Sequence, residues 1–90
     1  MTKKDTAVLR AMEGVAKAIG YIIRWDSGPF RGGRCTLGGR ELIILNRLHP
    51  TEVHLGVLAR ILRDAPLAEI SMRKAMRKRV ESVIRQHSSE

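Results

Sequence analysis

The sequence predicts an α+β fold with an N-terminal helix, a three-stranded mainly antiparallel sheet, and two C-terminal helices packed on one sheet face. Three observations lead to this prediction. Apolar residues recur every three or four positions near the start and again along the last forty residues, as in amphipathic helices. Between these segments lie short stretches of β-forming residues, separated by glycine pairs. Helices and strands that occur in separate runs favour α+β over an alternating βα arrangement.

The first helix is predicted to begin at Asp5 or Thr6, since either side chain could accept a hydrogen bond from a free backbone N–H. Gly20 follows the last apolar position and is expected to end the helix in a left-handed conformation. The apolar positions that share one side of this helix are Val8, Leu9, Met12, Val15, Ala16 and Ile19.

Three strands are predicted, over residues 21–25, 34–37 and 40–45. Gly38-Gly39 is expected to form a two-residue hairpin turn, because glycine takes positive φ without strain. In the second strand, alternation places Cys35 and Leu37 toward the core. The unbroken apolar run Leu42–Leu45 predicts a strand buried on both faces and therefore central in the sheet.

Pro50 is placed at the start of the second helix and a third helix is predicted from about Ser71. The predicted buried stripe of the second helix is Val53, Val57, Leu58, Ile61 and Leu62. The predicted apolar face of the third is Met72, Met76, Val80, Val83 and Ile84. Residues 1–90 are expected to form one domain with frayed tails at about 1–4 and 87–90.

Composition indicates a cytoplasmic protein without a membrane segment. Cys35 is the only cysteine among 90 residues, so no internal disulfide can form, and a lone thiol suits a reducing compartment. Residues 6–20 are interrupted by charges and do not resemble the apolar part of a signal peptide. The longest apolar run has four residues, far too few to cross a bilayer.

The charge balance is the strongest signal in the composition. Seventeen lysines and arginines against nine acidic residues leave a net charge of +8. Such a charge on a small domain favours association with polyanions such as nucleic acid or an acidic protein face, although it also simply aids solubility. A membrane-surface helix is not expected, because no Trp or Phe lies on the apolar face of the basic last helix.

Two basic clusters are candidates for contacts with nucleic-acid phosphates. The first follows the polar side of the last helix, which only Glu81 interrupts, and contains Arg73, Lys74, Arg77, Lys78 and Arg85. The second lies around the predicted hairpin and contains Arg31, Arg34 and Arg40. A stripe of cations binds phosphates without reading base sequence. The alternative for both clusters is a solvated charged surface.

Patterns for catalysis, metal or cofactor binding are not found. His49 and His54 are five positions apart and do not share a helix face, whereas a helical zinc pair needs a spacing of three or four. Cys35 has no cysteine partner, and a cysteine on an inward strand position is usually unreactive. The pairs Gly32-Gly33 and Gly38-Gly39 lack the phosphate-loop and dinucleotide patterns. No enzyme activity, metal or cofactor is therefore expected.

Parts of the chain resemble a family of short bacterial proteins of uncharacterised function. The resemblance rests on Gly32-Gly33-Arg34-Cys35-x-Leu37-x-Gly39, on Leu42–Asn46 and on Leu58-Ala59-x-x-Leu62. The element order is also similar to the front part of zinc metallopeptidases that cleave phage repressors. Arg60, Ile61 and Asp64 stand where that family needs two zinc ligands and a catalytic glutamate. The resemblance thus implies a catalytically dead relative, because arginine cannot replace a neutral imidazole ligand.

The sequence favours a non-enzymatic basic module that contacts DNA or RNA phosphates. The alternative is a protein-interaction or scaffold subunit that uses an open sheet edge or the Tyr21/Trp25 face, with another copy as one possible partner. An enzyme working through Cys35 is a third and weaker alternative.

Overall fold

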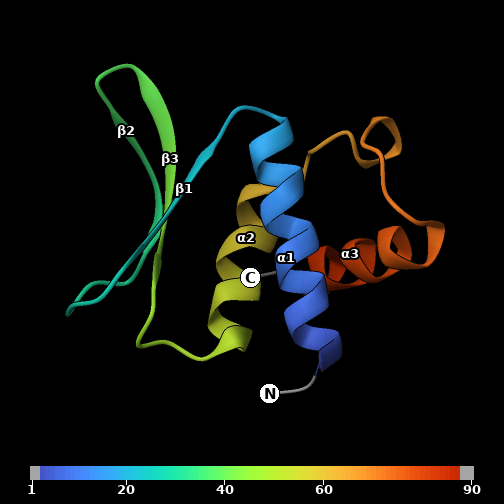
Figure 1. Cartoon of the computed structure of the whole chain (residues 1–90), viewed down its shortest axis with the longest axis horizontal. Helices are drawn as coiled ribbons and strands as arrows, with labels where there is room; N and C mark the ends of the chain where they lie inside the picture. Colours follow the sequence, from blue (N-terminus) through green and yellow to red (C-terminus); the bar gives the residue numbers. More distant parts are fainter. Residues whose placement is uncertain (1–2, 88–90) are drawn as a thin grey trace.

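A computed structural model describes residues 3–87 and confirms the α+β class and the order of elements. Figure 1 shows the elements in chain order. They are α1 (Lys3–Ala18), β1 (Ile22–Asp26), β2 (Gly33–Leu37), β3 (Arg40–Asn46), α2 (Thr51–Ile61), the 3₁₀ turn η1 (Leu67–Glu69) and α3 (Lys74–His87).

The sheet has the strand order β1-β3-β2, so β3 is central as the apolar run predicts. β3 pairs antiparallel with β2 through the predicted hairpin, but parallel with β1, which makes the sheet mixed. The parallel pair arises because the segment after β1 passes over the end of β3 before β2 begins. Asn46, the last residue of β3, holds this segment by donating from Nδ2 to the carbonyls of Gly28 and Phe30, both at 2.7 Å.

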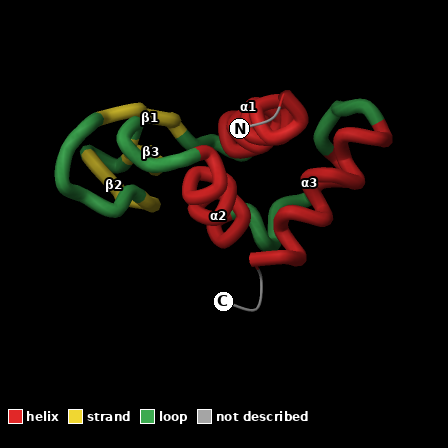
Figure 2. Tube along the Cα trace, turned by 90° about the horizontal axis from the view of Figure 1, so that it is seen from below, coloured by secondary structure: helices red, strands yellow, loops and turns green. Residues whose placement is uncertain are grey.

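The three helices form two layers beside the sheet. α1 and α2 lie next to the sheet, and α3 lies on their far side (Figures 1 and 2). Of the two C-terminal helices, only α2 therefore lies directly on a sheet face, while α3 packs on α1 and α2. The core lies between these layers, with Met12, Ile43, Leu58 and Val80 fully buried.

The N-terminal helix begins earlier than predicted and ends as predicted. Its first residue is Lys3, so Asp5 lies in the first turn rather than at the cap. At the other end Gly20 has φ of 106°, and the N–H groups of Gly20 and Tyr21 donate to the carbonyls of Lys17 and Ala16. This pair of hydrogen bonds is the Schellman motif. Of the predicted tails, residues 1, 2 and 88–90 lie outside the described residues.

The alternation predicted for β2 is wrong. Arg34 pairs with Ile43, whose side chain belongs to the core beneath the helices, so Arg34 faces the helix side of the sheet. Cys35 pairs with Leu42, whose side chain is on the opposite side, so Cys35 faces away from the helices. Cys35 is exposed and Leu37 is 62% exposed. Leu37 is exposed because the hairpin also extends past the helices (Figure 1), so its tip has no core to face on either side.

The second helix is buried on more sides than an amphipathic pattern predicts. α2 packs against the sheet, α1 and α3, and its seven buried residues include His54 and Gly56 as well as Leu58. Val53, predicted to be buried, is 38% exposed. The ring of His87 lies 3.3 Å from where a Cβ on Gly56 would stand, so the end of α3 approaches α2 closely there.

The third helix begins at Lys74, three residues after the predicted start, because η1 precedes it. Within η1 the backbone N–H of Ile70 donates to the carbonyl of Leu67. The sequence Asp64-Ala65-Pro66 predicts a break after α2, but its pattern gives no sign of a further short turn.

Gly32 to Ala should destabilise the fold more than Gly39 to Ala. Both glycines have positive φ, at 85° and 79°, so both variants carry a similar backbone strain of about 1–2 kcal/mol. A Cβ at Gly32 would also stand 2.8 Å from the carbonyl oxygen of Ile44, whereas the position beside Gly39 is open. Urea unfolding of the two variants measures the difference, and equal losses would show that the loop is not packed against β3.

Candidate functional site

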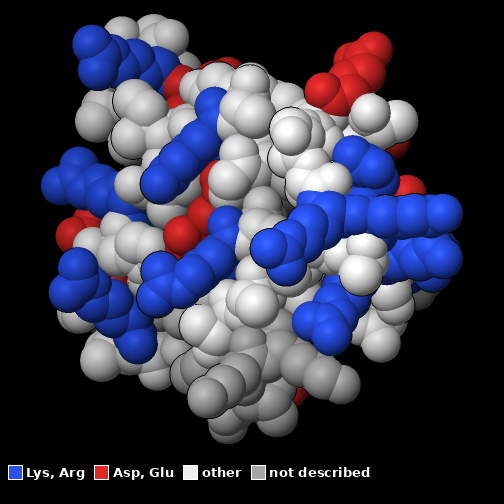
Figure 3. Space-filling model, turned by 45° about the vertical axis from the view of Figure 1, so that its right-hand side comes forward, with Lys and Arg blue, Asp and Glu red and all other residues white. Residues whose placement is uncertain are grey.

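The outer side of α3 carries an exposed row of cations. Lys74, Lys78 and Arg85 lie on the side away from the buried residues Val80 and Ile84. Arg73 and Arg79 flank this row and are exposed as well. Figure 3 shows lysine and arginine side chains over both halves of this face of the molecule, including its right-hand part, where α3 lies. We call Arg73, Lys74, Lys78, Arg79 and Arg85 the α3 basic face.

Arg77, predicted to contact phosphate, has a structural role in this fold. Its Nε donates to the carbonyl of Leu67 at 3.2 Å and its Nη2 to the carbonyl of Ile70 at 2.9 Å. These bonds hold η1 against the first turn of α3. The side chain is half-buried and two of its five N–H donors are engaged in these bonds, so we leave it out of the α3 basic face.

Arg77 to Met should lower the free energy of unfolding by about 1–2 kcal/mol, because two part-buried carbonyls lose a charged donor. Lys78 to Met is the matched control, because Lys78 is exposed on the same helix, and it should cost about 0.5 kcal/mol or less. Urea unfolding compares the two variants. Equal stability of both would contradict the structural role of Arg77.

The second predicted cluster is divided between two sides of the sheet. Arg31, Arg34 and Arg60 of α2 line one groove of about 510 Å³ on the helix side. Arg40 is paired with Leu37 at the tip of the hairpin, outside this groove. The structure thus brings Arg31 and Arg34 together with Arg60, which the sequence did not suggest, and leaves Arg40 apart.

Arg34 is held by two neighbours. Its Nη1 donates to the Tyr21 hydroxyl at 3.3 Å, and its Nε lies 3.9 Å from a carboxylate oxygen of Glu41. The hydrogen bond to Tyr21, followed by the charges of Tyr21 and Glu41, raises the pKa of Arg34 above its ordinary value. Glu41 also partly offsets the charge of Arg34, as Glu81 does for the cations next to it on α3.

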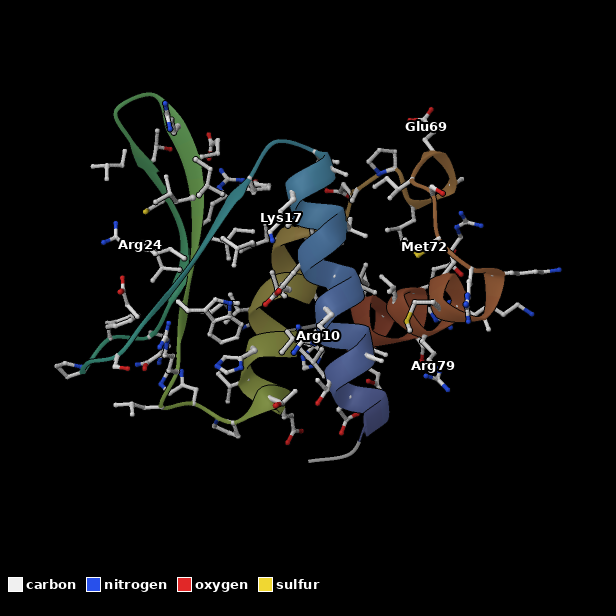
Figure 4. The ribbon with its side chains drawn as sticks, viewed as in Figure 1. Arg10, Lys17, Arg24, Glu69, Met72 and Arg79 are labelled. Carbon is white, nitrogen blue, oxygen red and sulfur yellow. The ribbon has the colours of Figure 1, made fainter. Side chains whose placement is uncertain are left out.

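The two basic clusters lie at opposite ends of the molecule. The β2–β3 hairpin is at one end and α3 at the other, with α1 and α2 between them (Figures 1 and 2). Further exposed cations that the sequence did not suggest are Arg10 and Lys17 on α1 and Arg24 on the outer side of β1, which Figure 4 labels. Arg24 is paired with Asp26 at 3.1 Å.

The sheet offers two edges and an outer face that no helix covers, although Leu42 in the central strand is only 7% exposed on that face. β1 and β2 each have one neighbour among the described strands. On the outer face Ile22 is 43% exposed and Leu37 is 62% exposed. The Tyr21/Trp25 face is different, because both rings pack against the core and are half-buried.

Residues 3–87 offer little that would serve as a metal site, a membrane helix or a catalytic site. No group of three or more His, Cys, Asp or Glu side chains lies close enough to hold a metal ion. In the same part of the chain no helix has the length and apolarity needed to cross a membrane. α2 ends at Ile61, so Asp64 lies beyond the helix that carries Arg60. Cys35 is an exposed free thiol on an edge strand.

A pocket of about 400 Å³ opens between α1, the end of β1 and the start of α2. Trp25, Arg47 and His54 line it, together with Arg10 of α1. Sequence patterns gave no sign of it, because the contributing residues come from four separate segments and carry no common spacing.

Comparison of the chain with protein-family models, with curated proteins and with solved structures gave no match.

Proposed function

We propose that this chain is a non-enzymatic module that binds nucleic-acid phosphates through the α3 basic face, without reading base sequence. The observation that carries the proposal is the exposed row of Lys74, Lys78 and Arg85 on the outermost helix, flanked by Arg73 and Arg79. From Lys74 to Lys78 the helix rises about 6 Å, and from Lys74 to Arg85 about 16 Å, so the row can follow a nucleic-acid backbone over several phosphates.

The placement of these charges is unfavourable for the helix itself, which supports a role in binding. The N-terminal end of a helix carries partial positive charge, and α3 has no acidic residue in its first turn. Lys74 and Lys78 are also like charges one turn apart. Each effect costs a few tenths of a kcal/mol in the free chain, and a bound anion would offset both.

Readout of base edges is not part of the proposal. The chain has one Trp, one Tyr and one Phe, so there are few aromatic rings for stacking on bases. Trp25 and Tyr21 are half-buried against the core at the opposite side of α1 and α2 from α3. Contacts to phosphates alone give affinity without sequence preference.

Binding of labelled duplex DNA, duplex RNA and single-stranded RNA over a series of salt concentrations tests the proposal. The logarithm of the association constant should fall linearly with the logarithm of salt concentration. Duplexes of unrelated sequence should bind within about threefold of one another, because base edges are not read. Absence of binding to all three at low salt would reject the proposal.

The uncovered outer face of the sheet favours a second candidate, which is self-association or docking of a partner protein at the sheet. Ile22 and Leu37 are exposed there, and β1 and β2 leave backbone groups at both edges. Light scattering at increasing protein concentration tests the self-association form, which predicts a dimer that Leu37 to Lys disrupts. A monomer at all concentrations would exclude that form.

We place the protein in the cytoplasm. Cys35 is exposed and has no cysteine in the chain to pair with, and a free thiol is best preserved in a reducing compartment.

A further inference from the structure

The pocket beside Trp25 is lined by apolar side chains, by cations and by the imidazole ring of His54. Its floor includes the apolar side chains of Leu9 and Trp25. Its rim carries the cations Arg10 and Arg47. A volume of about 400 Å³ is within the range of sites for small molecules.

His54 supplies a buried acceptor without a partner. The ring lines the pocket and is 6% exposed. Its Nε2–H donates to the backbone carbonyl of Asn46 at 2.6 Å, so in the neutral ring Nδ1 is an acceptor. Nδ1 is buried and, within residues 3–87, has no hydrogen-bond partner. A buried acceptor left unpaired is costly, and a donor on a ligand would remove that cost.

The position of the ring is fixed by its neighbours. Trp25 meets His54 edge to face, with ring centroids 4.7 Å apart and planes at 88°. Asn46, which fixes Nε2 through its carbonyl, is 2% exposed and is itself held by three side-chain hydrogen bonds. The ring is therefore held in place by a rigid part of the fold, as a binding site requires.

The other end of the pocket favours a negative charge. Arg10 and Arg47 outnumber the one lining carboxylate, Glu13. The 11-residue helix α2 also begins here, with Pro50 and Thr51 in the lining, so the positive end of its dipole meets the pocket.

We propose that this pocket binds a small organic acid that also carries a hydroxyl or amino donor. The carboxylate would lie between Arg10 and Arg47, and the carbon skeleton would cover the ring of Trp25. The donor would reach Nδ1 of His54 by displacing the side-chain atoms that cover it. This site is separate from the α3 basic face and does not depend on nucleic-acid binding.

The indole N–H resonance of Trp25 reports on this pocket alone, because Trp25 is the only tryptophan in the chain. Three probes separate the two polar contacts: 4-hydroxybenzoate has both groups, benzoate lacks the hydroxyl and phenol lacks the carboxylate. We expect a saturable shift with 4-hydroxybenzoate, at concentrations about tenfold lower than with either of the other probes. No shift at millimolar 4-hydroxybenzoate, or equal affinity for all three probes, would overturn the proposal.

Two arginine variants give the matched comparison. Arg47 to Met removes an exposed lining cation and should weaken 4-hydroxybenzoate binding about tenfold, whereas Arg40 to Met, at the hairpin tip, should leave it unchanged. Equal binding by both variants would overturn the proposal. A chain with Lys74 and Lys78 changed to Glu should bind 4-hydroxybenzoate normally, so failure of the nucleic-acid proposal is distinguishable from failure of this one.

Discussion

Changing Lys74 and Lys78 together to Glu should weaken duplex binding by about thirtyfold or more at about 0.1 M salt. Each reversal replaces an attraction of about 1 kcal/mol with a repulsion, so two reversals remove at least about 2 kcal/mol of binding free energy. The slope of the log–log salt dependence should also fall by about 2, because two phosphate contacts are lost.

The matched control is Arg31 and Arg40 changed to Glu. This variant has the same net charge as the Lys74/Lys78 variant, and its substitutions are on exposed positions at the opposite end of the molecule. It should keep binding within about threefold of the parent chain. Equal losses in the two variants would mean that the net charge of +8 acts as a diffuse field and that α3 is not a site.

The single substitution Lys74 to Glu separates an effect on binding from an effect on folding. A Glu at position 74 would complement the helix dipole and form a favourable pair with Lys78 one turn later. Lys74 to Glu alone should therefore raise the free energy of unfolding by about 0.5–1 kcal/mol while it weakens duplex binding. A variant that loses both stability and binding would contradict the argument that these cations are placed for a partner.

The largest effect on stability is expected at Asn46. Its side chain is 2% exposed, donates to the carbonyls of Gly28 and Phe30, and accepts from the N–H of Leu48 at 3.0 Å. Asn46 to Ala leaves these three backbone groups unpaired and should lower the free energy of unfolding by about 2–4 kcal/mol. That loss is a large fraction of the total stability of a small domain.

Asn46 to Asp tests which atoms matter. The carboxylate keeps the size and the acceptor for Leu48, but it cannot donate to the carbonyls of Gly28 and Phe30. The variant should lose about as much stability as Asn46 to Ala, measured by urea unfolding at pH 7. Retention of parent stability by Asn46 to Asp would show that the two donated bonds do not hold the loop.

The elements that rest on local signals could be predicted from the sequence. Gly38 and Gly39 both take positive φ in the hairpin turn, Gly20 ends α1, and the run Leu42–Leu45 forms the central strand. Each signal depends on a few neighbouring residues, because glycine allows a rare backbone conformation and continuous apolar residues need cover on both faces.

The remaining features depend on contacts between distant segments. The parallel pairing of β1 with β3 follows from the loop that Asn46 holds, and no local pattern encodes that loop's path. The predicted inward orientation of Cys35 is wrong. Alternation separates the residues on the two sides of a strand, but it does not tell which side the helices cover.

The candidate sites show the same division. The cations of α3 are visible as a helical pattern, so the α3 basic face could be read from spacing except for the inclusion of Arg79 and the role of Arg77. The bonds of Arg77 to Leu67 and Ile70 exist only because η1 folds back beside the helix. The pocket of Trp25 and His54 is assembled from α1, β1, α2 and a loop, and is visible only in three dimensions.

The most direct measurement of the central claim is a titration of the isotope-labelled chain with a short duplex, followed through its backbone amide resonances. Binding by the α3 basic face predicts that the largest shifts fall within residues 73–79 and at Arg85, and that they fade as salt is added. Largest shifts at residues 31–40 instead, or small shifts spread evenly over the chain, would contradict it.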